Sequence, residues 1–424
     1  MTPAAGAWRP NPDEAYSLWL DSLSRAGWTP GPSVERVPVA DALGRVTAVP
    51  VVARWPSPRS DCAAMDGIAI RAATVADSVP DTSVRLAAGA FEWVDTGDPM
   101  PDGADVVVMR EWLLPQADGS VVITGGVTVT DGTGSAGSRG PTVTPGKHVR
   151  RAGEDFAAGE VLVPPGRRLR PGGLAAAAGG GHASLSVCGR PAVVIIPTGD
   201  EIRTVGSAIR RGDIIDTNSL MLAGRCRELG AVPTVSAVQP DDPDVLAAEI
   251  RHVASGADLV LVIAGSSRGR GDHTGAVLAQ VGGVAVTGVA VRPGHPALLG
   301  QVKHRAGLAP VIGLPGYPLA SAVIFELFAA PLLALIGGAA EPPMPTLLAT
   351  LDRDWSSPPG IEDWVPVTLT PAPGKPPVAT PARRGAGSMS QLARADAWWR
   401  LPPDQVDVAA GATIEVIPLT PRWA

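Results

Sequence analysis

Hydrophobic and polar positions alternate regularly in the middle of the chain. Three apolar runs, at Ala192–Ile196, Leu259–Ala264 and Val311–Leu314, each end in a loop rich in glycine, proline or polar residues. Segments of helical period follow, most clearly at Asn218–Leu229 and Pro243–Ala254. Buried strands that alternate with amphipathic helices are typical of a doubly wound α/β sheet, so we predict that fold here.

Other predicted elements are less regular. Asn11 can cap a helix that continues to Trp28, because apolar residues recur along it at helical spacing. A strand is expected at Val235–Val238. The last helix of the α/β region, predicted at Leu319–Leu335, contains Pro331 and should kink or break there.

The apolar runs in the flanking regions are shorter. Residues 57–145 form short alternating pieces separated by turns, which predicts a small β-domain. Proline-rich short β pieces after residue 337 predict a C-terminal β-barrel or sandwich. The predicted domains are an elongated arm of residues 1–55 and 146–187, an inserted β-domain of residues 56–145, an α/β domain of residues 188–337 and a C-terminal β-barrel domain of residues 338–424.

Composition narrows the functional classes. The chain has 424 residues and a net charge of −6, which disfavours nucleic acid as the main partner. Its three cysteines form no CxxC pair, as expected in a reducing compartment. No apolar run reaches the roughly 18 residues needed to span a bilayer, so we expect a cytoplasmic protein without a membrane partner.

Acidic residues gather at the predicted strand ends. Asp200, Glu201, Asp241 and Asp272 would lie at one edge of the sheet, where like charges are costly unless a cation or substrate uses them. Asp242 is explained as a helix cap. Hard oxygen ligands without histidine or cysteine indicate Mg²⁺.

Basic and turn residues allow two interpretations each. Arg268, Arg270 and Arg292 could hold an oxyanion or could be solvated at the surface. Three turn residues could reach a ligand or bond only to their own backbone: Asp66, Thr96 and Asp155.

Six ordered motifs suggest a family: AMDGIAI, DTGDPMPDGADVVV, VRRAGEDFAAGEVLVPPGRRLRP, VVIIPTGDEI, VRPGHP and GLPGYP. In this order and spacing they resemble the molybdopterin molybdenumtransferase family, which includes MoeA and the gephyrin E domain. The C-terminal GAGSMSQLARADAWWRLP is similar to that family's last-domain motif, so the resemblance covers nearly the whole chain. It implies an elongated homodimer with a MogA-like α/β domain, an inserted β-domain and a C-terminal barrel.

The resemblance also implies a reaction. Adenylylated molybdopterin would be hydrolysed with Mg²⁺ while molybdate or tungstate is inserted at the dithiolene, with release of AMP. The implied catalytic residues are Asp66, Thr96, Asp155, Glu201 and Asp272, and the implied metal ligands are Asp155, Asp200, Glu201 and Asp272. The implied substrate-binding residues are Thr198, Gly199, Asp200, Asn218, Asp241, Ser266, Ser267, Arg268, Arg270, Arg292, His295, Pro315, Gly316, Tyr317, Ser321 and Ser388.

The chain departs from the family pattern at several positions: Ala320 stands where GLPGNPxS has its serine, although Ser321 is adjacent, and AGSSRGRG stands in place of the GGVSxG loop. Arg292 and His295 replace the two lysines of KPGKP, Tyr317 replaces the asparagine of GLPGNP, and Val365 stands where an arginine is expected. The retained acidic set favours an enzyme. The changed oxyanion donors favour the alternative, a non-catalytic paralogue that binds a pterin or nucleotide without inserting metal.

Dimerisation would complete the site. Arm residues such as Leu18, Leu23 and Val161 lie in pieces too short to bury them, so they should pack on a second copy. An arm that crosses the dimer would present Asp66 and Thr96 to the acidic loops of the other subunit.

Overall fold

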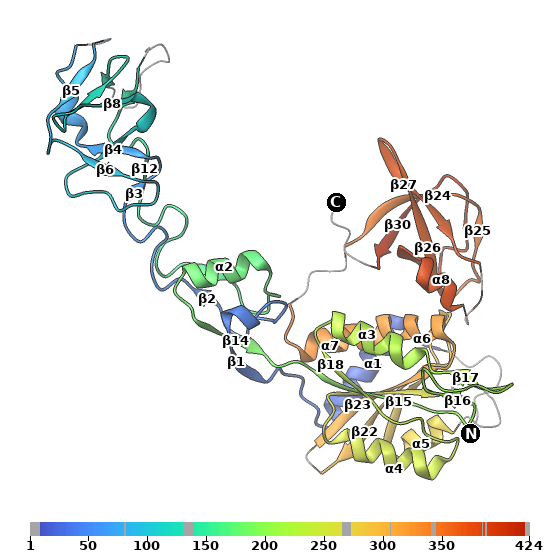
Figure 1. The fold of residues 1–424 in the computed structure, drawn as a ribbon. Helices are drawn as coiled ribbons and strands as arrows, with labels where there is room; N and C mark the ends of the chain where they lie inside the picture. Colours follow the sequence, from blue (N-terminus) through green and yellow to red (C-terminus); the bar gives the residue numbers. More distant parts are fainter. Residues whose placement is uncertain are drawn as a thin grey trace.

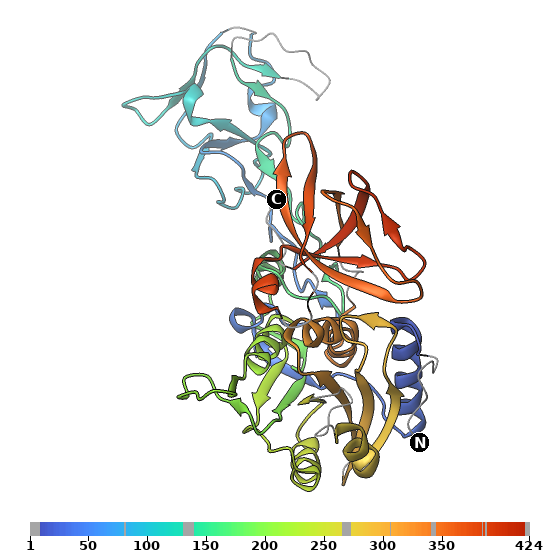
Figure 2. The ribbon, with the colours of Figure 1, turned by 90° about the vertical axis from the view of Figure 1, so that its right-hand side faces the viewer.

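The computed structural model describes residues 9–79, 82–129, 140–264, 273–305, 307–340, 345–383, 385 and 388–419. The molecule is elongated (Figure 1), with a β-domain at one end, an irregular arm in the middle and the α/β domain beside a barrel at the other end. Figure 2 shows the barrel on the side of the α/β domain that carries α6 (Pro318–Ile324). This architecture agrees with the predicted multidomain α/β class.

The α/β domain is built on one six-stranded sheet. Five of the six strands run in the same direction, and β22 (Leu298–His304) alone runs antiparallel to its two neighbours. The order is β18 (Val232–Val235), β15 (Ala192–Pro197), β19 (Leu259–Ala264), β23 (Gly307–Pro315), β22 (Leu298–His304) and β20 (Gly282–Thr287).

Two strands differ from the prediction. The strand expected at Val235–Val238 lies three residues earlier as β18, where Pro233 is tolerated because β18 is an edge strand. Strand β22 was not predicted. It forms a hairpin with β23 through the pairing of His304 with Gly307 and runs antiparallel between β23 and the edge strand β20.

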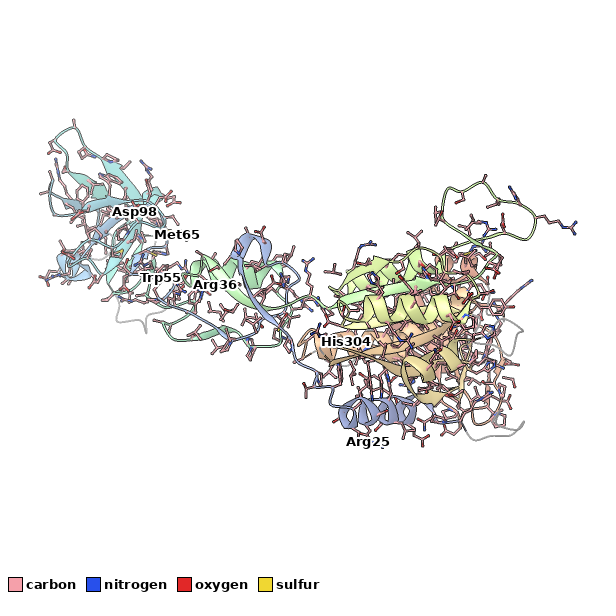
Figure 3. The ribbon with its side chains drawn as sticks, turned by 90° about the horizontal axis from the view of Figure 1, so that it is seen from below. Arg25, Arg36, Trp55, Met65, Asp98 and His304 are labelled. Carbon is pink, nitrogen blue, oxygen red and sulfur yellow. The ribbon has the colours of Figure 1, made fainter. Side chains whose placement is uncertain are left out.

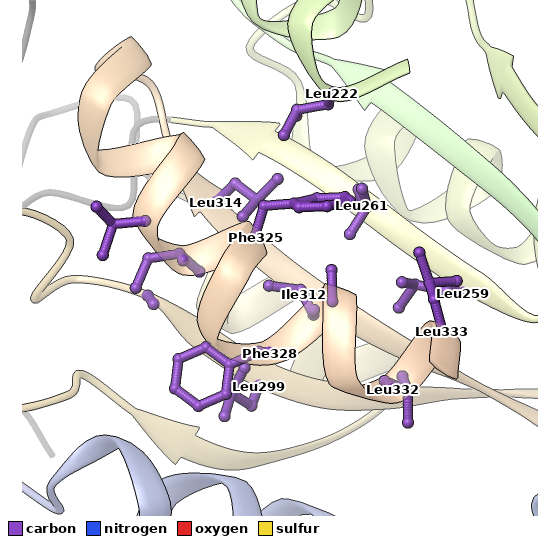
Figure 4. Packing of buried hydrophobic residues seen from close by; sticks show 14 of the residues in the cluster. Leu222, Leu259, Leu261, Leu299, Ile312, Leu314, Phe325, Phe328, Leu332 and Leu333 are labelled. Carbon is purple, nitrogen blue, oxygen red and sulfur yellow. The ribbon is translucent and has the colours of Figure 1, made fainter. Parts of the chain in front are cut away.

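Apolar cores cover both faces of this sheet. Along β15, Val193 and Ile195 belong to one cluster, while Val194 and Ile196 belong to the other. The first cluster packs against α3 (Asn218–Glu228), α6 and α7 (Ala330–Ile336), and Figure 4 shows its leucines and phenylalanines. The second packs against α4 (Pro243–Ala254) and α5 (Thr274–Val281). Strands buried on both faces explain the continuous apolar runs of the sequence.

The last helix changes its winding instead of breaking. A π-helical turn, η4 (Phe325–Ala329), joins α6 to α7, and Pro331 lies in the first turn of α7, where a proline is tolerated. Among the described residues, the continuous helix Pro318–Ile336 is the one long and apolar enough to cross a membrane, although no apolar run of that length was expected. Of its most apolar stretch, 61% is buried inside the protein, and Phe325 and Phe328 are fully buried. The helix therefore belongs to the core of the α/β domain.

Helix α1 (Pro12–Arg25) lies on the sheet, not in the arm. Asn11 caps it through a capping box with Glu14, as the sequence indicates. The indole nitrogen of Trp19 donates to the carbonyl oxygen of Gly300 at 2.8 Å, and Trp19 and Leu23 are fully buried against the α/β core. The assignment of this helix to the arm is therefore wrong, because the edge of the sheet at β20 and β22 leaves a face that α1 covers.

The remainder of the arm is formed by two distant parts of the chain. Strand β1 (Val34–Pro38) pairs with β14 (Ser184–Cys188), and β2 (Val51–Val52) pairs with β13 (Val161–Val163). Figure 3 shows this slender segment between the β-domain and the α/β domain.

The β-domain holds two three-stranded sheets. One has the order β6 (Glu92–Val94), β4 (Gly67–Ile70) and β7 (Val106–Met109); the other has β5 (Val84–Leu86), β9 (Val121–Ile123) and β8 (Leu113–Pro115).

The C-terminal region is a closed five-stranded barrel, as predicted. Pairing of the first and last strands in the order below closes the ring. The order is β26 (Glu362–Ala372), β27 (Lys375–Pro381), β24 (Leu347–Leu351), β30 (Thr413–Pro418) and β28 (Ala397–Leu401). One short strand of the α/β domain, β21 (Val291–Arg292), pairs with β26 and so fastens the barrel to the body.

Candidate functional site

A cavity of about 540 Å³ opens at the carboxyl ends of the parallel strands. Ligands of open α/β sheets bind at this edge because helix N-termini and free backbone N–H groups gather there. Its wall includes the end of β15, the start of α3, the loop before α6 and Met389 from the barrel: Pro197, Thr198, Glu201, Ile202, Ile214, Ile215, Asp216, Thr217, Asn218, Ile263, Pro296, Pro315, Gly316, Tyr317, Pro318 and Met389.

A second cavity of about 360 Å³ lies between the α/β domain and the barrel. Both cavities have Pro296, Pro315 and Tyr317 in their walls. Tyr317, which directly precedes α6 and is 65% exposed, borders both of them. The two cavities are therefore adjacent lobes of one candidate site.

Three predicted carboxylates, Asp200, Glu201 and Asp241, lie close to one another, and Glu201 is in the wall of the first lobe. The backbone N–H of Asp241 donates to Oδ1 of Asp200 at 3.3 Å. Burial raises the pKa of Asp241, and the negative charges of Glu201 and Asp200 raise it further. Repulsion of this kind is relieved by a cation, and the donor set of carboxylate oxygens suits Mg²⁺. Within the described part of the chain, no three acidic, histidine or cysteine side chains form a complete ligand cluster, so further ligands are needed.

The raised pKa of Asp241 gives a pH-dependent prediction. The protonated carboxyl favours the folded state, and this contribution is lost as the pH rises through the raised pKa. We therefore expect Asp241→Asn to raise the thermal midpoint of unfolding at neutral pH. The gain in the free energy of unfolding should be no more than about 1 kcal/mol, since the side chain is largely solvated. The difference should shrink as the pH falls below the raised pKa.

Thermal denaturation over a pH series measures this effect. Asp77→Asn, at an exposed position in the β-domain, is the matched control and should leave the midpoint unchanged. A lower midpoint for Asp241→Asn at neutral pH would show that Asp241 has a favourable partner.

Buried polar atoms also point to a ligand. Nδ2 of Asn218 donates to the carbonyl oxygen of Gly316 at 2.8 Å, but its Oδ1 atom has no hydrogen-bond partner among the described residues. The same holds for the hydroxyls of Ser219 and Ser321, which are 3% and 0% exposed. Buried polar atoms are normally bonded, so a ligand or water belongs beside them. Ser219 was not predicted, although its place in the first turn of a helix beside Asn218 is a usable signal.

Arg292, predicted as an oxyanion ligand, already has a carboxylate partner. Its Nε and Nη2 atoms donate to Oδ1 and Oδ2 of Asp363 at 3.2 and 2.5 Å. Ser357 donates to the same carboxylate at 3.1 Å, and Asp363 is only 3% exposed. Asp363 was not predicted from the sequence. The pairing of β21 with β26 places it opposite Arg292.

His295 lies in the wall of the second lobe. Burial lowers the pKa of its imidazole, and the positive charge of Arg9 lowers it further. The side chain is therefore neutral at neutral pH and supplies a polar edge without a charge.

Residues predicted on the inserted domain are far from both lobes within one chain. The backbone N–H and the hydroxyl of Thr96 each donate to Oδ1 of Asp66 at 2.7 Å, and these bonds lower the pKa of Asp66. Met65 and Asp98, which lie close to them in sequence, mark their place at the far end of the arm (Figure 3). Asp155 lies in the arm, where its N–H donates to the carbonyl oxygen of Ser57.

The other predicted residues have varied positions. Thr198 donates through its hydroxyl to the carbonyl oxygen of Ile263 at 3.0 Å, and Gly199 has a φ of 134°, in a loop conformation that favours glycine. Ser388 directly precedes Met389 of the first lobe, and its hydroxyl is 3.2 Å from that of Ser390. Five predictions lie outside the described residues: Ser266, Ser267, Arg268, Arg270 and Asp272.

Comparison with known proteins gives consistent matches along the chain. Three family models match: the MoeA N-terminal region (domain I and II) at residues 11–181, a probable molybdopterin binding domain at 194–335, and the MoeA C-terminal region (domain IV) at 349–419. The chain is similar to molybdopterin molybdenumtransferase 2 of Mycobacterium tuberculosis, at 32% identity over 91% of this chain and 95% of that protein. It is also similar to molybdopterin molybdenumtransferase of Synechococcus elongatus, at 30% identity over 91% and 94%.

A solved structure agrees over the whole length. The MoeA molybdopterin biosynthesis protein of Pyrococcus horikosii matches with a TM-score of 0.78 and 26% identity, covering 98% of this chain and 100% of that one. The three family models match most of the chain in the expected order. The chain belongs to the MoeA family.

Proposed function

We propose that this protein inserts molybdate or tungstate into adenylylated molybdopterin, with release of AMP, in molybdenum cofactor biosynthesis. The observation that supports this most strongly is the group formed by Asp200, Glu201 and Asp241 beside a cavity at the carboxyl ends of the strands. The names of the relatives supply the substrate class, since both are molybdopterin molybdenumtransferases.

In this proposal the first lobe binds the phosphoanhydride. Asp200 and Glu201, completed by further ligands, would hold Mg²⁺, which when bound neutralises charge on the phosphates. The unpartnered Oδ1 atom of Asn218 accepts a hydrogen bond from the substrate, and its amide, held by Gly316, keeps the side chain oriented. The apolar wall formed by residues such as Ile214 limits the access of water to the phosphoanhydride. An oxygen of molybdate would attack the phosphorus of the adenylyl group in line, and the bond from that phosphorus to the oxygen of the pterin's phosphate would break. AMP would then leave with the molybdate oxygen as the dithiolene sulfurs take its place on molybdenum.

The proposal includes a homodimer with a composite site. Within one chain Asp66, Thr96 and Asp155 cannot reach the acidic group, so the same residues of a second copy would complete it. Exposed apolar side chains on the arm support pairing: Val34 is 62% exposed, Leu43 54% and Val161 51%. A twofold arrangement would cover such residues.

A second candidate is a non-catalytic protein that binds a pterin or nucleotide. The ion pair of Arg292 with Asp363 favours it, because this pair removes a free positive charge from the place where an oxyanion ligand was expected. Calorimetric titration with molybdate separates the candidates: tight, saturable oxyanion binding removes the reason for this second one.

Turnover tests the main proposal directly. Purified protein is incubated with adenylylated molybdopterin, Mg²⁺ and molybdate or tungstate, and AMP and metal-loaded pterin are measured. We expect both products, and we expect Glu201→Gln to reduce their formation by about 10²-fold or more, as is typical when a group that stabilises transition-state charge is removed. Arg85→Ala, which changes an exposed ion pair in the β-domain, is the control. Absence of AMP and of metal-loaded pterin under all conditions contradicts the proposal.

A further inference from the structure

We infer that the second lobe, between the α/β domain and the barrel, binds a flat, uncharged heteroaromatic ring and not a free oxyanion. The inference rests on the proposed function, since a substrate that contains pterin and adenine supplies such rings. It adds the chemical class of the group that this lobe accepts.

The wall of this lobe is largely apolar and aromatic. Trp355 and Trp364 are held by edge-on contacts with two other tryptophans, at centroid distances of 6.2 and 5.9 Å. Tyr317, which is 65% exposed, adds a third ring to the wall. Four prolines complete the surface: Pro293, Pro296, Pro315 and Pro366. Rigid aromatic and proline rings favour a planar partner, because they offer large contact areas with little loss of conformational freedom.

The charges at this lobe compensate each other. Arg292 is paired with Asp363, as described above, and Glu362 accepts two hydrogen bonds from Arg400 at 2.9 and 2.8 Å and one from Trp364 at 2.6 Å. Inside the lobe, a multivalent anion would therefore lose its hydration against a guanidinium that Asp363 already shares. Arg383, the remaining described cation of the wall, is exposed at the rim.

Polar groups remain for the edge of a neutral ring. The ion pair with Asp363 uses Nε and Nη2 of Arg292, which leaves Nη1 available as a donor. The neutral imidazole of His295 can donate or accept. A carbonyl oxygen or ring nitrogen of a heterocycle can bond to these groups while Asp363 keeps its partner, and this geometry favours a ring over an oxyanion.

Titration of the full-length protein with free ligands tests the inference. Pterin, adenosine and molybdate are titrated in separate experiments, and binding is followed by calorimetry and tryptophan fluorescence. We expect saturable binding of at least one ring compound. Tyr317→Ala and Trp355→Ala should each weaken it about ten-fold, because stacking of a base on an aromatic side chain is worth about 1–3 kcal/mol. Trp93→Ala, at an exposed tryptophan of the β-domain, is the control and should leave affinity unchanged.

Each outcome has a defined meaning. The ring compound that binds identifies pterin or adenine as the source of the ring. The inference is overturned if neither pterin nor adenosine binds. It is also overturned if both variants keep the wild-type affinity, or if molybdate competes with the ring compound for the lobe. Circular dichroism checks that Trp355→Ala is folded, and the exposed Tyr317 provides an independent test if it is not. Because free ligands undergo no turnover, a failure to release AMP would overturn the proposed function without affecting this result.

Discussion

Arg292→Ala is expected to lower the free energy of unfolding by about 3 kcal/mol, the largest effect of a single substitution that we predict. The substitution leaves the carboxylate of Asp363, with 5% of its side chain exposed, without its bidentate partner. The hydroxyl of Ser357 also donates to this carboxylate, but a neutral donor does not replace a guanidinium. Because the pair joins β21 to β26, the barrel should lose its attachment to the α/β domain first.

Urea denaturation followed by tryptophan fluorescence measures the loss. Asp363→Asn introduced into the Arg292→Ala chain should recover part of it, since the buried charge is then removed. The control is Arg85→Ala, whose pair with Asp118 has both side chains 59% exposed and should contribute about 0–1 kcal/mol. Equal stability of the Arg292→Ala and Arg85→Ala proteins would mean that other groups neutralise Asp363.

Co-expression of Asp66→Asn and Glu201→Gln chains is expected to restore about a quarter of wild-type turnover, although each variant alone is inactive. In the proposed composite site, each centre takes Asp66 from one copy and Glu201 from the other. About half of randomly formed dimers are mixed, and each mixed dimer has one intact centre of two. Turnover is measured as AMP release, which should be about a quarter of wild type in the unfractionated mixture and about half in tagged, purified mixed dimers.

A second pair of variants provides a matched control. Glu201 and Asp241 lie on the same α/β domain, so a mixed dimer of Glu201→Gln and Asp241→Asn chains has one damaged residue in each centre. This mixture should remain inactive. No recovery in the verified mixed dimer with Asp66→Asn, or a monomeric protein by light scattering, contradicts the composite site.

The two expected effects depend on different parts of the molecule. The ion pair of Arg292 is a contact within one chain and can be measured without substrate. The complementation depends on the long arm, which separates Asp66 from the acidic group within each copy (Figure 1). Stability and turnover can therefore be tested independently.

Local sequence patterns by themselves determined much of the α/β domain. Helix α4 begins and ends as predicted, with Asp242 accepting hydrogen bonds from the backbone N–H groups of Asp244 and Val245 at 2.9 and 3.1 Å. Strand β19 also has its predicted bounds, because a continuous apolar run suits a strand buried on both faces. These elements depend on residues within a few positions of each other, so periodicity and capping were sufficient.

Tertiary structure decided which elements meet. The bond from Trp19 to Gly300 joins residues 281 positions apart and moves α1 from the arm to the sheet. The pair of Arg292 with Asp363 joins residues 71 positions apart and turns a candidate oxyanion ligand into a link between domains. The sequence showed that these side chains are apolar or charged, but their partners depend on how the sheet, the arm and the barrel pack. Short-range periodicity contains no information on contacts between such distant residues, and for that reason only the folded chain identified them.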